Sequence, residues 1–127
     1  MKLYTFSYDS SYEPSAPVLT MVVSWDQDIE ERLVALIDSG ADATMIPVHV
    51  LRNVGARYIG EMRMRGVLGV SQIVDIFVVN VRVGAFTING VEAIAVLEGS
   101  EAIVGRDVLN NLIVTLNGLA NTAEISG

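Results

Sequence analysis

The sequence predicts a single all-β domain, and three observations support this. Its length of 127 residues is that of one domain. Hydrophobic residues make up 51% of the chain, and the prominent Val and Ile favour strands over helices. Short apolar runs alternate with turn signals at intervals of about 8–12 residues. Together these patterns indicate a β-barrel or a β-sandwich.

Composition excludes several classes of function. Eight basic and fifteen acidic residues give a net charge of −7, which argues against nucleic acid and anionic membranes as partners because phosphate binding needs clustered Lys and Arg. The chain has no cysteine, so disulfides, thiolate metal sites and a Cys nucleophile are excluded. We expect no cofactor and no bound metal.

The N-terminal segment is polar and lacks the apolar core of a signal peptide. No apolar run approaches the roughly 18–20 residues of a membrane helix. We therefore expect a cytoplasmic protein. Residues 1–17 end at Pro17 and are interpreted as an irregular N-terminal arm, which leaves residues 18–127 as the folded domain.

The expected elements follow from hydrophobic periodicity and turn residues. Arg32 to Ile37 is nearly all apolar, so we expect a strand buried on both faces. Asn89-Gly90 is the strongest hairpin signal in the chain. Asp107 is a possible N-cap of a helical turn. The other expected elements are a strand over 18–25, a short helix over 47–54, an extended hairpin over 58–83 with its tip at 66–70, and strands over 102–104 and 112–116, followed by a turn at 117–118 and one more strand.

Asp38 is the most informative single residue. It follows five apolar residues directly, although charged groups are rarely buried without a partner. Ser39 adds a hydroxyl, and Gly40 lets the backbone turn sharply. A carboxylate at a rigid strand end beside these two residues suits acid–base chemistry. Asp-Ser-Gly alone, however, is also a common turn sequence.

Two other kinds of site fit less well. Asp38, Gly40 and Asp42 have the alternate spacing of calcium ligands, but His49 stands where an EF-hand needs its acidic twelfth residue. His49 is also the only histidine and lies outside any serine motif, so a Ser-His-Asp triad has no support.

Two motifs together resemble the retropepsin-like aspartic proteases. The first is the segment ALIDSGADAT from Ala35 to Thr44, and the second is AIVGRDVL from Ala102 to Leu109. Between them lies a glycine-containing hairpin, where this family has its flap. The resemblance extends over roughly Val18 to Leu116. It implies an all-β fold, a closed acid-protease-type β-barrel with one or two short helices, and a dimeric assembly.

The resemblance also implies a mechanism. An aspartic protease needs two carboxylates that share one proton, because like charges at close range cannot both ionise. This chain has one Asp-Ser-Gly and is too short for two lobes of about 100 residues each. An Asp38/Asp38' dyad across a homodimer would complete the site, because a two-fold interface places the same patch on both sides. The implied function is an aspartic endopeptidase that acts on a peptide or protein substrate.

The resemblance assigns roles residue by residue. Asp38 is the catalytic carboxylate, the Ser39 hydroxyl holds the dyad across the dimer, and Gly40 gives substrate close access. Ala41 and Asp42 contact the substrate main chain, together with the flap tip Gly66, Val67, Leu68, Gly69 and Val70. Thr44, Gly105, Arg106 and Asp107 support the site, with Arg106 paired to Asp42.

Interpretations without a catalytic role stay open at this point. The Asp42–Arg106 pair could be a surface ion pair worth about 0–1 kcal/mol, and the flap an ordinary hairpin. The fold could also serve as a peptide-binding or dimerisation module with little or no proteolysis. The long arm and the modest glycine content of the flap keep that alternative open, whereas the intact Asp-Ser-Gly favours the enzyme.

Overall fold

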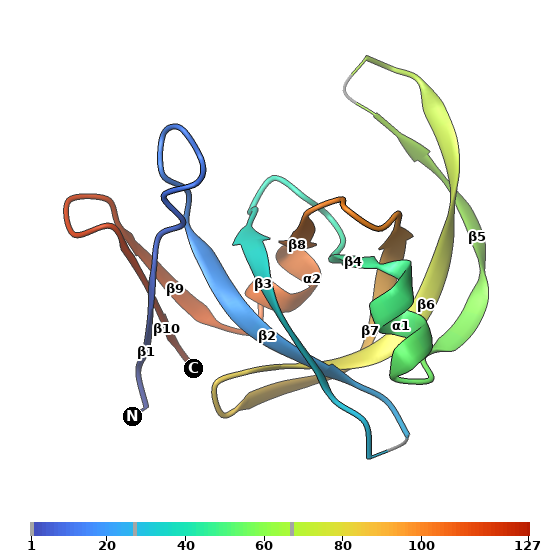
Figure 1. Ribbon diagram of the computed structural model, residues 1–127, viewed down its shortest axis with the longest axis horizontal. Helices are drawn as coiled ribbons and strands as arrows, with labels where there is room; N and C mark the ends of the chain where they lie inside the picture. Colours follow the sequence, from blue (N-terminus) through green and yellow to red (C-terminus); the bar gives the residue numbers. More distant parts are fainter. Residues whose placement is uncertain (1, 27, 67) are drawn as a thin grey trace.

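The computed structural model describes residues 2–26, 28–66 and 68–127, and strands dominate this part of the chain (Figure 1). In order, the elements are β1 (Tyr4–Ser7), β2 (Val18–Ser24), β3 (Glu31–Ile37), β4 (Met45–Pro47), α1 (Val48–Asn53), β5 (Arg57–Arg65), β6 (Ser71–Val83), β7 (Phe86–Val96), β8 (Ala102–Val104), α2 (Arg106–Leu109), β9 (Ile113–Asn117) and β10 (Thr122–Ser126). The predicted all-β class is confirmed, including the short helices.

Six strands of the described chain close into a barrel. The order is β2-β3-β8-β4-β7-β6, and β6 pairs back onto β2. β5 pairs with β6 outside this ring, so the β5–β6 hairpin projects from the barrel wall (Figure 1). Alternate residues of each strand point inwards, which is why Leu19, Met21 and Val23 of β2 are all fully buried. The closed barrel predicted from the resemblance is confirmed.

β3 differs from its prediction as a strand buried on both faces. Ala35 and Ile37 face the core and are buried, whereas Val34 on the opposite face is 56% exposed. The reason is that a barrel wall covers only one face of each strand. The apolar run of β3 therefore did not indicate a strand that is buried on both faces.

The predicted Asn89-Gly90 hairpin is wrong. The chain turns instead at Gly84-Ala85, between the paired residues Val83 and Phe86. Asn89 and Gly90 lie within β7, where the two of them oppose the single residue Asn80. Gly90 has a φ of 71°, and its N–H donates to the Asn80 side chain at 3.1 Å. The pair that predicted a turn thus forms a β-bulge, which also uses a glycine with positive φ.

A separate small sheet forms beside the barrel. In the described residues it has three strands in the order β1-β10-β9, all antiparallel. β1 comes from the segment predicted as an irregular arm, so residues 4–7 are regular strand. The sheet lies on the side of the barrel away from the β5–β6 hairpin (Figure 1).

Candidate active site

Parallel pairing of β3 with β8 brings the two sequence motifs together. Ile37 pairs with Val104, and the Asp38 N–H donates to the Val104 carbonyl at 3.1 Å. The residues that follow these strands, Asp38 and Gly105, therefore leave the sheet side by side. Motifs more than sixty positions apart in the sequence thus form one local structure.

Asp38 is held at the end of β3 by its own turn. Its Oδ1 accepts the Gly40 N–H at 2.9 Å, and its carbonyl accepts the Ala41 N–H at 3.1 Å. Asp38 is half-buried, while Ser39 and Gly40 are exposed. A Cβ at Gly40 would lie 3.2 Å from Asp38 Oδ1, which is tighter than ordinary contact. The turn therefore orients the carboxylate and leaves it accessible.

Arg106 fixes the loop that carries Asp38. Its guanidinium donates to the Ser39 carbonyl at 2.7 Å and to the Asp42 carboxylate, and its backbone N–H donates to the Ala41 carbonyl at 2.9 Å. The Asp42 side chain is 89% exposed, so the ion pair by itself adds little stability. Its value is geometric, because one side chain ties two points of the loop to α2.

Thr44 and Asp107 form a second link behind the loop. The Thr44 hydroxyl donates to Asp107 Oδ1 at 2.7 Å, and the Thr44 N–H donates to Oδ2 at 3.0 Å. The same hydroxyl accepts the Gly105 N–H at 3.1 Å. Thr44 is completely buried, so this carboxylate satisfies polar groups that water cannot reach.

The sequence predicted Asp107 as a possible N-cap of α2, and this prediction is wrong. Gly105 occupies that position, and Asp107 lies in the first turn, where Oδ1 also accepts the Val108 N–H at 3.0 Å. The physical reason is the buried Thr44, whose two donors attract the carboxylate. Gly105 is also sterically required, because a Cβ there would lie 2.8 Å from the carbonyl of Ala43.

Comparison with known proteins agrees with this geometry. Residues 29–111 match the family described as "gag-polyprotein putative aspartyl protease". The chain belongs to this family. The match covers both motifs of the site and the hairpin between them. A search of curated proteins finds no match.

Solved structures of retropepsin-like proteases share the fold. A retropepsin-like aspartic protease from Rickettsia conorii is similar with a TM-score of 0.64 at 8% identity, over 99% of this chain and 94% of that one. The EIAV protease complexed with the inhibitor HBY-793 is similar with a TM-score of 0.57 at 20% identity, over 76% of this chain and 86% of that one.

The hairpin tip of this family member is closed by two backbone hydrogen bonds. The Gly66 N–H donates to the Val70 carbonyl at 2.9 Å, and the Gly69 N–H donates to the Gly66 carbonyl at 3.0 Å. Gly69 has a φ of 74°, which favours glycine. Leu68 is 90% exposed and Val70 is 68% exposed. Val67, also predicted to contact substrate, lies outside the described residues.

A cavity of about 610 Å³ separates the hairpin from the active-site loop. Asp42 and Ala43 line it on one side, Gly60 and Met62 of β5 on another, and Val91 of β7 on a third. The sequence did not predict the contribution of β7. The Asn89-Gly90 signal obscured it, because a hairpin there would break β7 in two.

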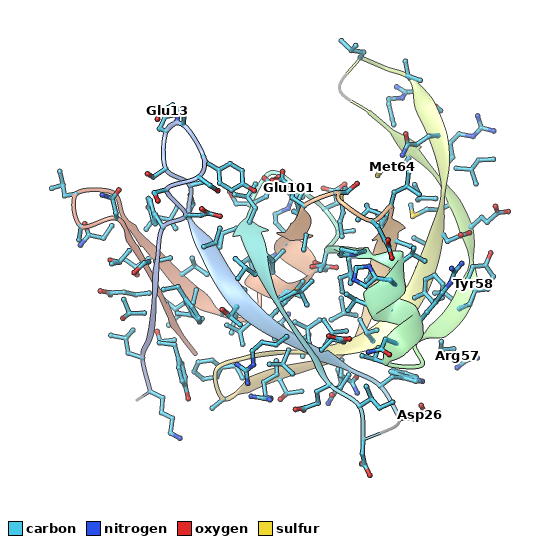
Figure 2. The ribbon with its side chains drawn as sticks, viewed as in Figure 1. Glu13, Asp26, Arg57, Tyr58, Met64 and Glu101 are labelled. Atoms are coloured by element: carbon cyan, nitrogen blue, oxygen red, sulfur yellow. The ribbon has the colours of Figure 1, made fainter. Side chains whose placement is uncertain are left out.

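An aromatic pair joins the two strands of the hairpin at its base. The rings of Tyr58 and Phe77 meet edge to face with centroids 5.3 Å apart. Figure 2 shows Tyr58 and Arg57 at this base and Met64 farther towards the tip. Burial raises the pKa of the Tyr58 phenol, as does the nearby Asp75 carboxylate.

The N-terminal loop makes an unpredicted contact with the segment before β8. The Tyr12 hydroxyl donates to the Glu101 carboxylate, just before β8. Figure 2 shows Glu13 at the tip of this loop and Glu101 beside β8. The hydrogen bond to Glu101 raises the pKa of Tyr12. Nothing in the local sequence around Tyr12 or Glu101 indicates this contact.

Among residues 2–26, 28–66 and 68–127, no group of three or more metal-ligating side chains gathers. His49 lies 3.5 Å from Glu98, and both side chains are largely exposed. In the described part of the chain, neither helix is long and apolar enough to cross a membrane.

Proposed function

We propose that this chain is an aspartic endopeptidase whose active site forms in a homodimer. The observation that carries the proposal is the position of Asp38, which the β3–β8 pairing and the Gly40 N–H hold at the accessible end of a strand. The chain has one Asp-Ser-Gly, so a second copy supplies the other carboxylate. The Ser39 hydroxyl, exposed beside Asp38, contacts the partner's loop.

The chemistry follows from two carboxylates that share a proton. The ionised carboxylate removes a proton from a water molecule while the water oxygen attacks the carbon of the scissile peptide bond. The protonated carboxyl gives its proton to the carbonyl oxygen, which forms a tetrahedral diol. Collapse of the diol breaks the C–N bond. The leaving nitrogen takes a proton from one carboxyl, and a diol hydroxyl gives its proton to the other carboxylate, so that a carboxylic acid and an amine are released. Each turnover consumes one water and returns the shared proton.

Substrate lies between the active-site loop and the hairpin. Ala41 and Asp42 bind its main chain from below, and the flap tip 66–70 closes from above. Extended peptides bind through main-chain hydrogen bonds with alternate side chains in pockets. The cavity beside Asp42 and Met62 is such a pocket.

The test is cleavage of a peptide library by the Asp38→Asn variant between about pH 4 and 7. Asn keeps an oxygen that can accept the Gly40 N–H, so the fold is expected to survive. We expect cleavage to fall by at least about 10²-fold, the lower range for loss of acid–base catalysis. The control is Asp26→Asn, an exposed residue at the end of the barrel away from the active-site loop (Figure 2).

Two outcomes would contradict the proposal. Undiminished cleavage by Asp38→Asn would assign the activity to another group or to a contaminant. A wild-type chain that stays monomeric and cleaves nothing at any of these pH values would favour the binding-module alternative.

A further inference from the structure

A second cavity opens beside β3, the strand that leads to Asp38. Its volume is about 370 Å³, and its lining includes Tyr12 of the N-terminal loop, Val34 and Leu36 of β3, and Glu101. Leu36 lies two residues before Asp38, which corresponds to about 7 Å along an extended strand. We call this cavity the Tyr12 pocket. It shares no lining residue with the cavity of about 610 Å³ described above.

Strand alternation places Val34, Leu36 and Asp38 on one face of β3. Successive side chains of a strand point to opposite faces, and Ala35 and Ile37 point into the barrel core. The Asp38 N–H still bonds to a carbonyl of β8, so the alternation extends to Asp38. Val34 is 56% exposed and Leu36 is half-buried. An apolar stripe on the outer face of β3 therefore leads from Asp38 into the Tyr12 pocket.

The N-terminal loop is built to hold Tyr12 at this pocket. Asp9 and Ala16 close the loop through backbone hydrogen bonds of 2.8 and 3.1 Å. Asp9 Oδ1 also accepts the Ser11 N–H at 2.9 Å and the Ser11 hydroxyl at 2.7 Å. The Tyr12 hydroxyl donates to the Glu101 carboxylate, eighty-nine positions away in the sequence. This hydrogen bond holds the Glu101 carboxylate at the pocket.

The charges of the lining favour a cationic ligand. Asp9, Glu31 and Glu101 contribute three carboxylates to the pocket, whereas its basic residues are Arg32 and His49. Within residues 2–26, 28–66 and 68–127, neither Glu101 nor Arg32 forms an ion pair. The Glu101 carboxylate can therefore accept hydrogen bonds from a cation in the pocket, in addition to the one from Tyr12.

The register of β3 and β8 sets the distance from Glu101 to the active site. Ala35 pairs with Ala102, so Glu101 lies level with Val34, about 13 Å from Asp38 along the strand direction. Long cationic side chains lay their aliphatic stems on apolar surface and keep the charged end at a polar group. The stripe that leads from Asp38 offers such a surface, and Glu101 lies at its end.

We propose that the Tyr12 pocket receives the substrate side chain next to the scissile bond, and that Glu101 selects Lys or Arg there. This inference rests on the aspartic endopeptidase proposed above. The aliphatic stem lies on Leu36 and Val34, and the cationic end donates hydrogen bonds to the Glu101 carboxylate. Tyr12 is a positioning residue, because it acts on the substrate through Glu101.

Glu101→Gln removes the charge and keeps the contact, because the Gln amide oxygen can still accept the Tyr12 hydroxyl. The probes are fluorescent octapeptides that differ only at one central residue, which is Arg, Lys, norleucine or Glu. Fluorescence anisotropy measures their binding to chains that also carry Asp38→Asn, so that no peptide is cleaved during the titration. With Glu101 in place, we expect the Arg and Lys peptides to bind about three- to tenfold more tightly than the norleucine peptide. With Glu101→Gln, we expect this preference to disappear.

The matched control is Glu98→Gln. Glu98 is an exposed carboxylate three residues before Glu101, and it does not line the Tyr12 pocket. We expect the control to keep the preference for Arg and Lys. Tyr12→Phe should reduce this preference and leave the affinity for the norleucine peptide unchanged, whereas a general loss of packing would weaken the binding of all four peptides.

Cleavage gives the position of the selected residue. In chains that retain Asp38, we expect mass spectrometry of the products to place the broken bond next to Arg or Lys. Cleavage only at bonds distant from these residues would overturn the assignment of the pocket.

The outcomes separate this inference from the proposed function. Equal binding of the four peptides, no binding of any of them, or a preference that Glu98→Gln removes as fully as Glu101→Gln would overturn the role of Glu101. The endopeptidase would survive each of these results if Asp38→Asn abolishes cleavage. Conversely, Glu101-dependent binding by a chain that cleaves none of the peptides would support the selectivity of the pocket and contradict the proposed function.

Discussion

Removal of the Asp107 carboxylate should lower the free energy of unfolding, because this carboxylate links α2 to the buried Thr44 behind the active-site loop. Asp107 accepts two hydrogen bonds from Thr44, and Thr44 is completely buried. A hydrogen bond to a charged group contributes about 1.5–3 kcal/mol, and a buried donor without an acceptor costs more than an exposed one. Water can replace the third bond, to Val108, because Asp107 is only partly buried. We therefore expect Asp107→Ala to lower the free energy of unfolding by about 3–5 kcal/mol.

The assay is urea unfolding at a fixed protein concentration, since the proposed dimerisation would make stability depend on concentration. With a slope of about 2 kcal/mol per molar urea, the midpoint should fall by about 2 M. Asp107→Asn should lie between the wild type and Asp107→Ala, because its amide offers one acceptor oxygen where the carboxylate has two. The exposed control Asp26→Ala should stay within about 0.5 kcal/mol of the wild type.

One result would refute this reasoning. If Asp107→Ala matches Asp26→Ala in midpoint, the Thr44–Asp107 link contributes no net stability. The buried Thr44 hydroxyl would then find its acceptor elsewhere, and the role of α2 as the support of the active-site loop would be lost.

Two further perturbations probe neighbouring parts of the site. Gly105→Ala places a Cβ 2.8 Å from the Ala43 carbonyl, so we expect the free energy of unfolding, measured in urea, to fall by about 1–3 kcal/mol. The control Gly118→Ala, whose added Cβ would have nothing within 4 Å, should be near neutral. Equal effects of the two substitutions would contradict the steric argument. The Glu101 carboxylate raises the pKa of Tyr12 through their hydrogen bond, so Glu101→Gln should lower that pKa towards its ordinary value in an ultraviolet titration referenced to Tyr12→Phe. The hydrogen bond is favoured below the pKa of Tyr12 and is lost as the pH rises through that pKa. An unchanged Tyr12 pKa in Glu101→Gln would show that the two groups do not interact in solution.

The sequence predicted the centre of the site because its chemistry is local. Asp38, Ser39 and Gly40 are consecutive, and an acidic residue directly after five apolar residues can be recognised in the sequence without knowledge of the fold. The second motif could be assigned only through the family resemblance. Nothing in residues 102–109 alone shows that β8 runs parallel to β3, which is the fact that places Gly105 beside Asp38.

The failures share one physical cause, which is that local signals have more than one tertiary use. A glycine with positive φ serves a turn or a bulge equally well, so Asn89-Gly90 could not be told from Gly84-Ala85 by sequence. Asp is a common N-cap residue, but the Asp107 carboxylate instead accepts a hydrogen bond from the buried Thr44, sixty-three positions away. β3 has the composition of a doubly buried strand, yet the barrel covers one face.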